Sequence, residues 1–154
     1  MINLNVSTKI YRPIKQVFDF VSNPENDFQW QYGTLAAARL PDGTDRPGSF
    51  FRTIGHLLGQ RLQGIFEVTE YEPNKKYAFR SIAGPLHLQT CYTFNIDSGS
   101  TKVSIATQAH AANNFEMSES LLERKMKKQL KENLVLLKDL LEAKEILSGT
   151  TAIS

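Results

Sequence analysis

The fold is decided by residues 86–111, which read LHLQTCYTFNIDSGSTKVSIATQAHA. Apolar and polar side chains alternate on both sides of the turn signal Asp97-Ser98-Gly99-Ser100, and this alternation is typical of half-buried strands. Strands joined by so short a connection are antiparallel neighbours, because parallel strands need a long crossover. The stretch therefore predicts a hairpin with one buried face.

The same alternation continues towards the N-terminus and predicts a single antiparallel sheet. We expect seven strands, at residues 2–10, 30–40, 49–57, 60–71, 76–83, 86–96 and 101–111. After the first strand, Pro13 and Asn23-Pro24 each indicate the start of a short helix, since proline suits the first helical turn and asparagine caps it. We place these helices at residues 13–22 and 23–28.

A long amphipathic helix is expected over residues 117–144. Its apolar residues step by threes and fours along one face, and they are Leu122, Met126, Leu130, Leu134, Leu137 and Leu141. At about 1.5 Å per residue the helix is roughly 40 Å long, which is enough to cross the sheet. A curved sheet with a helix laid across its concave face encloses space, so we expect a pocket between them.

Composition and length indicate one ordinary globular domain at residues 1–144, followed by a loosely ordered tail at 145–154. Of the 154 residues, 41% are hydrophobic and 22% charged, and the net charge of +2 is too small to indicate nucleic-acid binding. Cys91 is the only cysteine, so no internal disulfide can form, which fits a reducing compartment. Met1 leads directly into the first strand, and no apolar run approaches the roughly 20 residues of a membrane span. We therefore expect a cytoplasmic protein without a membrane span.

The inner face of the predicted sheet mixes aromatic rings with hydroxyl groups. Period-two parity turns inward the rings of Phe51, Phe66, Phe79 and Phe94 and the hydroxyls of Thr53, Tyr77, Ser81, Thr90, Tyr92 and Thr107. A filled core rarely carries so many hydroxyls, because a buried hydroxyl without a partner costs about 1–3 kcal/mol. One explanation is a pocket in which a ligand or water bonds to them. The alternative is a filled core in which they bond to the backbone or lie at strand ends.

We expect the pocket to bind a small hydrophobic molecule that carries one or two polar groups, without a cofactor. The predicted lining residues are Trp30, Phe51, Phe66, Tyr77, Phe79, Tyr92 and Phe94, with Leu122, Met126 and Leu130 as the floor. The hydroxyls of Tyr77 and Tyr92 are expected to orient the ligand. For Trp30, a place at the pocket rim and plain packing against the first short helix both remain open.

Several motifs resemble the START/birch-pollen-allergen-like (SRPBCC) superfamily and its polyketide cyclase/dehydrase-like branch. The motifs are Pro13-x-x-x-Val17-Phe18, Asn23-Pro24, Trp30, Val68-Thr-Glu70-Tyr71-Glu72-Pro73 and Tyr77-Ala-Phe79-Arg80-Ser81. The resemblance covers roughly residues 2–144. It implies an α+β helix-grip fold, in which a seven-stranded curved antiparallel sheet surrounds a long C-terminal helix and two short helices follow strand one. It also implies a deep hydrophobic cavity. Some members close and dehydrate polyketide chains, whereas others carry lipids, hormones, quinones or pigments, so the ligand class stays open.

The sequence offers no convincing catalytic constellation. Cyclisation needs a base and a hydrogen-bond donor beside the substrate, and the inward set contains neither a carboxylate nor a histidine. Tyr77 and Tyr92 can donate to a carbonyl but are poor bases, since tyrosine has an ordinary pKa near 10. Arg52 becomes a candidate only if the third strand has the opposite parity to the one we favour. A cyclase/dehydratase-type enzyme therefore stays an alternative to binding alone.

The remaining reactive side chains are interpreted as surface groups. His56, His87 and His110 lie outward on three different strands, so we predict no metal site. Cys91 has no neighbouring signal for a nucleophile and is interpreted as an inert thiol. The basic residues within 124–131 fit a solvated helix face. A protein-interaction module that binds through the sheet or this basic segment is the second alternative, and the sequence does not specify the oligomeric state.

Overall fold

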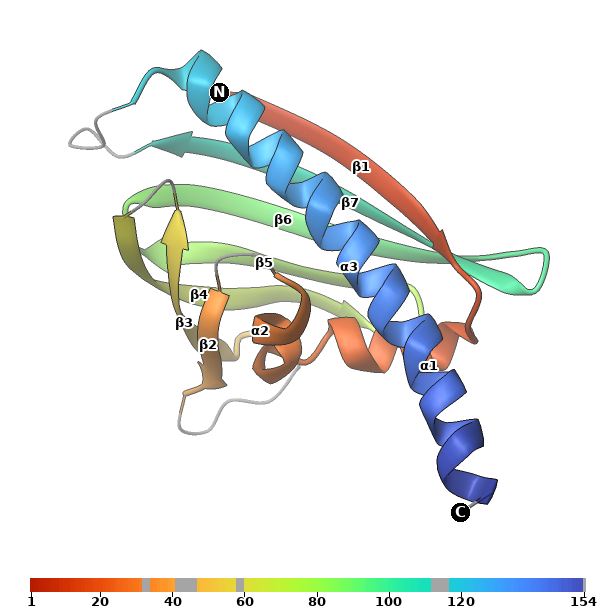
Figure 1. Ribbon diagram of the computed structural model, residues 1–154. Helices are drawn as coiled ribbons and strands as arrows, with labels where there is room; N and C mark the ends of the chain where they lie inside the picture. Colours follow the sequence, from red (N-terminus) through yellow and green to blue (C-terminus); the bar gives the residue numbers. More distant parts are fainter. Residues whose placement is uncertain (32–33, 41–46, 58–59, 112–116, 154) are drawn as a thin grey trace.

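The computed structural model is an antiparallel sheet that curves around one long helix (Figure 1). It describes residues 1–31, 34–40, 47–57, 60–111 and 117–153. The elements are β1 (Ile2–Ile10), α1 (Ile14–Val21), a 3-10 turn η1 (Pro24–Asn26), α2 (Asp27–Trp30), β2 (Thr34–Arg39), β3 (Phe50–Leu57), β4 (Gln60–Glu72), β5 (Lys76–Ala83), β6 (Leu86–Asp97), β7 (Ser100–Ala111) and α3 (Glu119–Ile153).

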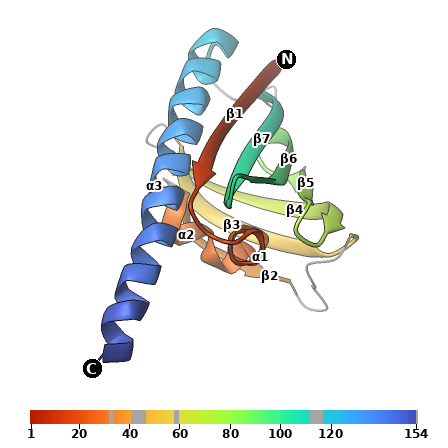
Figure 2. The same cartoon turned by 90° about the vertical axis from the view of Figure 1, so that its right-hand side faces the viewer.

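The strands form one sheet in the order β1-β7-β6-β5-β4-β3-β2, and neighbouring strands are antiparallel throughout. Figure 2 shows the curvature of this sheet, with α3 along one side and α1 and α2 at one end. The predicted α+β helix-grip fold is confirmed. The hairpin between β6 and β7 turns through Ser98 and Gly99, which both have positive φ angles of 50° and 83°.

The second short helix is longer than the sequence predicts and takes Trp30 out of the sheet. Asn23 caps η1 by accepting a hydrogen bond from the backbone N–H of Glu25 (3.1 Å), and the turn continues as α2 to Trp30. The backbone N–H of Gln31 still donates to the carbonyl of Asp27 (2.7 Å), so helical bonding persists to this point. The prediction that strand two begins at Trp30 is therefore wrong, and β2 begins at Thr34.

The long helix α3 confirms the predicted apolar face and continues beyond its predicted end. Ser118 caps it by accepting a hydrogen bond from the backbone N–H of Leu121 (3.3 Å). All six residues of the predicted face are buried except Leu130, which is partly buried. The helix runs to Ile153, beyond the end at residue 144 that the sequence predicts, and the loose order expected for 145–154 stays a prediction.

The core divides into two halves along α3. In the larger cluster, which we call the closed half, Leu134, Leu137 and Leu141 pack among aromatic rings. These rings are Phe18, Phe20, Trp30, Phe51, Tyr77, Tyr92 and Phe94. The smaller cluster, which we call the open half, contains Ile2, Leu4, Ala109, Leu122 and Met126, with Leu86, Leu88, Met117 and Leu130 partly buried against it. In both views the first half of α3 lies beside β1 (Figures 1 and 2).

A group of polar side chains, which we call the clamp, ties the closed half of α3 to the end of β1. The guanidinium of Arg12 donates to the backbone carbonyls of Leu141 (3.2 Å) and Glu142. The ammonium of Lys138 donates to the carbonyl of Lys9 (2.7 Å) and to the carboxylate of Glu142 (2.8 Å). These bonds fix the helix against the sheet on the side where the core is filled.

Candidate functional site

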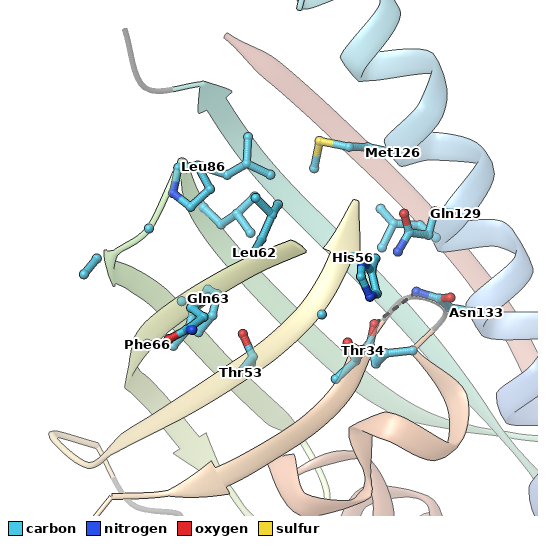
Figure 3. Close-up of a pocket in the computed structure, with 18 residues that line it drawn as sticks. Thr34, Thr53, His56, Leu62, Gln63, Phe66, Leu86, Met126, Gln129 and Asn133 are labelled. Carbon is cyan, nitrogen blue, oxygen red and sulfur yellow. Dashed lines mark hydrogen bonds between the residues drawn. The ribbon is translucent and has the colours of Figure 1, made fainter. Parts of the chain in front are cut away.

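A cavity of about 200 Å³ lies in the open half, between the first half of α3 and the strands β3 and β4 (Figure 3). Its apolar wall residues are Leu62, Phe66, Leu86, Leu88, Met126 and Leu130, and its polar ones are Gln31, Thr34, Thr53, His56, Gln63, Gln129 and Asn133. Small residues complete the wall: Gly55, Gly64, Ala83, Gly84 and Pro85. A dry cavity of about 150 Å³ can hold benzene. The open half therefore has room for a small guest.

The cavity exists because residues without large side chains face the helix. A Cβ atom at Gly64 would lie 2.9 Å from Cε2 of Phe66 and 3.5 Å from Oγ1 of Thr53. Gly84, in the turn between β5 and β6, has a φ of +136°, and a Cβ there would lie 3.1 Å from the carbonyl oxygen of Gln63. A side chain at Gly64 would thus press on the ring of Phe66, and one at Gly84 would press on the backbone of β4.

Two amides and a tyrosine, which we call the amide relay, connect the cavity wall to the closed half. Asn133 Nδ2 donates to Gln31 Oε1 (3.0 Å), and Gln31 Nε2 donates to the hydroxyl of Tyr92 (3.0 Å). Asn133 and Tyr92 are only 2% and 3% exposed, so these bonds offset the cost of removing polar groups from water. The amide relay joins α3, the end of α2 and β6.

The carboxyl group of Asp27 lies near the amide relay, and burial disfavours its charged form. Burial raises the pKa of the Tyr92 hydroxyl, the negative charge of Asp27 raises it further, and the hydrogen bond from Gln31 acts in the opposite direction. Burial also raises the pKa of the Asp27 carboxyl well above its ordinary value. Tyr92 is therefore a neutral hydrogen-bonding group at physiological pH and not a base.

The structure places three of the ten predicted lining residues in the cavity wall, and these are Phe66, Met126 and Leu130. The other seven, which pack in the two core clusters, are Trp30, Phe51, Tyr77, Phe79, Tyr92, Phe94 and Leu122. Tyr77 stacks on Tyr92 at 6.1 Å between ring centroids, and Trp30 meets Tyr92 edge-on at the same distance. Trp30 is 1% exposed and belongs to the core. A ligand contact for any of the ten stays a prediction.

Most of the inward hydroxyls that suggested a pocket are satisfied within the protein. Thr90 and Thr107 bond to each other through their hydroxyls (3.1 Å), and Ser81 accepts a hydrogen bond from a backbone N–H of β6 (2.8 Å). Tyr92 is bonded in the amide relay. Of these residues, Ser81 bonds to the backbone as the filled-core alternative predicts, whereas Thr90, Thr107 and Tyr92 bond to other side chains. Of the six hydroxyl residues, Thr53 is the one that the described cavity wall includes.

Sequence reasoning missed the polar residues of the wall that come from helices. Asn133 had a recognisable signal, because it lies three residues after Leu130 and four before Leu137, on the apolar face of α3. Gln31 had no such signal, since its place depends on α2 ending at Trp30, two residues beyond the end that the sequence predicts. Gln129 borders the same face and is half-buried.

The predicted alternation of β3 turns Arg52 and His56 outward, and both side chains are exposed, although His56 also borders the cavity. Arg52 is exposed, as the favoured parity predicts, and this removes it as a buried catalytic candidate. The same parity predicts His56 outward, yet it borders the cavity, at the same end as Thr34 and Asn133 (Figure 3). It is the last residue but one of β3, where the cavity wall ends, so an exposed side chain can border the mouth.

The outer face of the sheet brings together two histidines that are separate in the sequence. His87 and His110 are register partners on β6 and β7, and their rings stack at 4.6 Å. Across the ranges that the structure describes, no group of three or more His, Cys, Asp or Glu side chains could hold a metal ion. Burial raises the pKa of the Cys91 thiol, which lowers its reactivity. None of the described helices has the length and hydropathy that crossing a membrane requires.

Comparison with known proteins identifies a family and a widely shared fold. The family model described as "Polyketide cyclase / dehydrase and lipid transport" matches residues 1–142. The protein TTHA0849 from Thermus thermophilus has 13% identity and a TM-score of 0.79, over 92% of this chain and 98% of that one. A START superfamily protein from Mycobacterium smegmatis has 15% identity and a TM-score of 0.76, over 92% and 97%.

The third similar structure is part of a larger protein, the di-domain ARO/CYC BexL from the BE-7585A biosynthetic pathway. It has 14% identity and a TM-score of 0.72, over 92% of this chain and 47% of that one. No curated protein matches the chain in sequence. Identities this low show a common fold alone.

Proposed function

The chain belongs to the polyketide cyclase/dehydrase and lipid transport family, and from that premise we propose that it binds a small, largely apolar molecule in the cavity of the open half. The observation that supports this proposal is the apolar wall, to which the sheet contributes Leu62, Leu86 and Leu88 and the helix contributes Met126 and Leu130. Apolar surface left in water costs about 25 cal/mol per Å². A guest that covers this wall removes that cost.

The size of the cavity suggests modest affinity for a small guest. A ligand of about ten non-hydrogen atoms that gains roughly 0.5 kcal/mol per atom binds with about 5 kcal/mol, which corresponds to a Kd of a few hundred micromolar. A larger natural ligand would reach beyond the cavity mouth, where His56 and Gln63 are exposed. We propose that polyketide-, lipid- or quinone-like molecules are the class to test.

Binding without chemistry fits the wall better than a cyclase reaction does. His56 is the one ionisable side chain among the described wall residues, whereas a cyclase needs both a base and a donor. A cyclase/dehydratase remains the second candidate, because the wall that includes His56 also includes the amide of Gln31, which is a hydrogen-bond donor. Turnover of a poly-β-ketone substrate that is lost in His56→Ala would favour this candidate. A cytoplasmic location stays a prediction from the sequence.

The proposed function is tested with a pair of variants on one helix. Leu130 lies in the cavity wall, and Leu136 is 42% exposed on the same helix. We expect wild type and Leu136→Trp to bind ethylbenzene in an NMR titration, and Leu130→Trp to bind it at least about tenfold more weakly, because the indole occupies the cavity. Equal affinity in all three proteins would place the guest elsewhere. Native mass spectrometry of freshly purified wild type then identifies any molecule retained from the cell.

A further inference from the structure

The two ends of the cavity differ in chemistry. Leu62, Leu86 and Met126 gather at one end, and Thr34, His56, Gln129 and Asn133 gather at the other (Figure 3). We call the second group, together with Gln31, the polar end. A guest that buries an apolar body against the leucines therefore directs any polar substituent toward the amides, because polar atoms without partners are costly to bury. Thr53 and Gln63 are also polar and lie in another part of the wall, away from the amides (Figure 3).

Gln31 is held in place before any ligand arrives. Its backbone N–H donates to Asp27 (2.7 Å), and its carbonyl accepts from the N–H of Thr34 (2.9 Å). Its side chain is fixed at both atoms by Asn133 and Tyr92. These two side-chain bonds use one of its two amide hydrogens and one of its two carbonyl lone pairs. The remaining hydrogen and lone pair belong to a side chain that borders the cavity, so Gln31 is a preorganised donor and acceptor.

The polar end lacks a fixed charge. Lys, Arg, Asp and Glu are absent from the wall over the residues that the structure describes, and His56 is the one group there that can ionise. A carboxylate head group would leave water without a permanent cation to replace its hydration, whereas an alcohol or carboxamide would find amide partners. The chemistry of the wall therefore discriminates between head groups of the same size.

We propose that Gln31 is the specificity residue of the cavity and that it selects amphiphiles with a neutral hydrogen-bonding head, such as an alcohol or a carboxamide, over both hydrocarbons and carboxylates. This inference rests on the proposed function, since it requires that the cavity admits an apolar body. It narrows the ligand class from any hydrophobic molecule to neutral amphiphiles whose polar group meets the amide relay.

Four ligands with the same phenyl body test the proposal: ethylbenzene, phenethyl alcohol, phenylacetamide and phenylacetate. Their affinities are measured by NMR titration at about pH 8, above the usual titration range of imidazole. We expect phenylacetamide to bind at least about tenfold more tightly than phenylacetate, and roughly three- to tenfold more tightly than ethylbenzene. In Gln31→Met, which keeps the side-chain length, the preference for phenylacetamide over ethylbenzene should disappear, while ethylbenzene binding stays within about twofold.

The controls separate the inference from the function on which it rests. Gln108→Met changes an exposed glutamine on the other face of the sheet, outside the described wall, and should leave all four affinities unchanged. If Gln31→Met does not fold, Gln31→Glu serves instead, because a carboxylate can accept hydrogen bonds from both Asn133 and Tyr92. This variant should bind phenylacetate more weakly than wild type does and should favour phenethylamine.

Failure of every ligand to bind overturns the proposed function. Binding of ethylbenzene with no gain for phenylacetamide, or a gain that Gln31→Met preserves, overturns the role of Gln31 alone.

Discussion

The closed and open halves of the core use the same helix face but differ in what lies opposite to it. In the closed half, Leu134, Leu137 and Leu141 meet aromatic rings from α1, α2 and the sheet, and the interior is filled. In the open half, Met126 and Leu130 face glycines and small residues of β3, β4 and the β5–β6 turn, and a cavity remains. The comparison teaches that the helix supplies apolar side chains to both halves and that the sheet decides where the interior is hollow.

The two halves also differ in how the helix is attached. The clamp ties the closed half to the end of β1 through Arg12 and Lys138. The amide relay lies at the boundary between the halves, with Tyr92 inside the filled core and Gln31 at the cavity wall. A rigid, filled half beside a hollow half lets the protein keep a binding space without losing the stability of its core.

The largest effect is expected from a truncation in the closed half. Leu137 is fully buried, with no exposed surface. Leu137→Ala should lower the free energy of unfolding by about 2–5 kcal/mol, because the side chain leaves a cavity among rings that can relax only partly. Urea denaturation measures this change. A loss below about 1 kcal/mol would mean that the closed half is not the tightly packed region described above.

The matching truncation in the open half should lower the free energy of unfolding by a smaller amount. Met126 borders the existing cavity, so Met126→Ala enlarges a space that is already there and removes fewer contacts. We expect a loss of less than about 2 kcal/mol in urea denaturation, together with tighter binding of guests larger than ethylbenzene. Equal costs for Leu137→Ala and Met126→Ala would remove the distinction between the two halves.

A smaller and more specific effect is expected at Gly64. Its added methyl group would press on the ring of Phe66, which borders the cavity and can move into it. Gly64→Ala should therefore cost less than about 1 kcal/mol of stability but reduce ethylbenzene affinity several-fold. The double variant Gly64→Ala/Phe66→Leu provides the control, since removing the ring should restore binding. Binding unchanged in Gly64→Ala would show that this ring does not limit the space.

The smallest effect concerns the clamp and depends on pH. Burial alone would raise the pKa of Glu142, but the hydrogen bonds from Lys138 and the Tyr11 backbone, with the charges of Lys138 and Arg12, lower it overall. A carboxyl with a lowered pKa in the folded protein contributes stability above its ordinary pKa of 4.5, and this contribution is lost as pH falls through the folded value.

Glu142→Gln should therefore lower the melting temperature at neutral pH, by an amount worth less than about 1 kcal/mol, and should bring variant and wild type together in acid. Differential scanning calorimetry between neutral and acid pH measures this difference. Glu123→Gln, at an exposed position on the same helix within the open half, serves as the matched control variant. A pH-independent effect of Glu142→Gln would assign its role to packing instead of charge.

The fold could be predicted from the sequence because its signals are local and periodic. Alternation over β6 and β7 and the apolar face of α3 each specify one element and its buried side. The cavity could not be placed in the same way. Its position depends on Gly64 and Gly84, which approach other parts of the sheet, and on contacts between residues distant in the chain. The number of inward hydroxyls is a poor guide to the position of the cavity, because hydroxyls on neighbouring strands, such as those of Thr90 and Thr107, form hydrogen bonds with each other.

Of the residues at the polar end of the cavity, the sequence could identify Asn133 but not Gln31. Asn133 could have been found from its position on the apolar face of α3, since an amide there needs a partner. Its partner, Gln31, is separated from it by 102 positions and falls within the predicted second strand. Periodicity therefore shows that Asn133 is a buried polar residue that needs a hydrogen-bond partner. The three-dimensional structure shows that Gln31 is such a partner.

A crystal structure of the protein under xenon pressure tests the central claim most directly, because xenon enters dry apolar cavities without needing a specific ligand. We predict a xenon site in the open half, in contact with Leu62, Met126 and Leu130, and none among Leu134, Leu137 and Leu141. An open half without xenon, with its side chains in contact across the space between α3 and β4, would contradict the account.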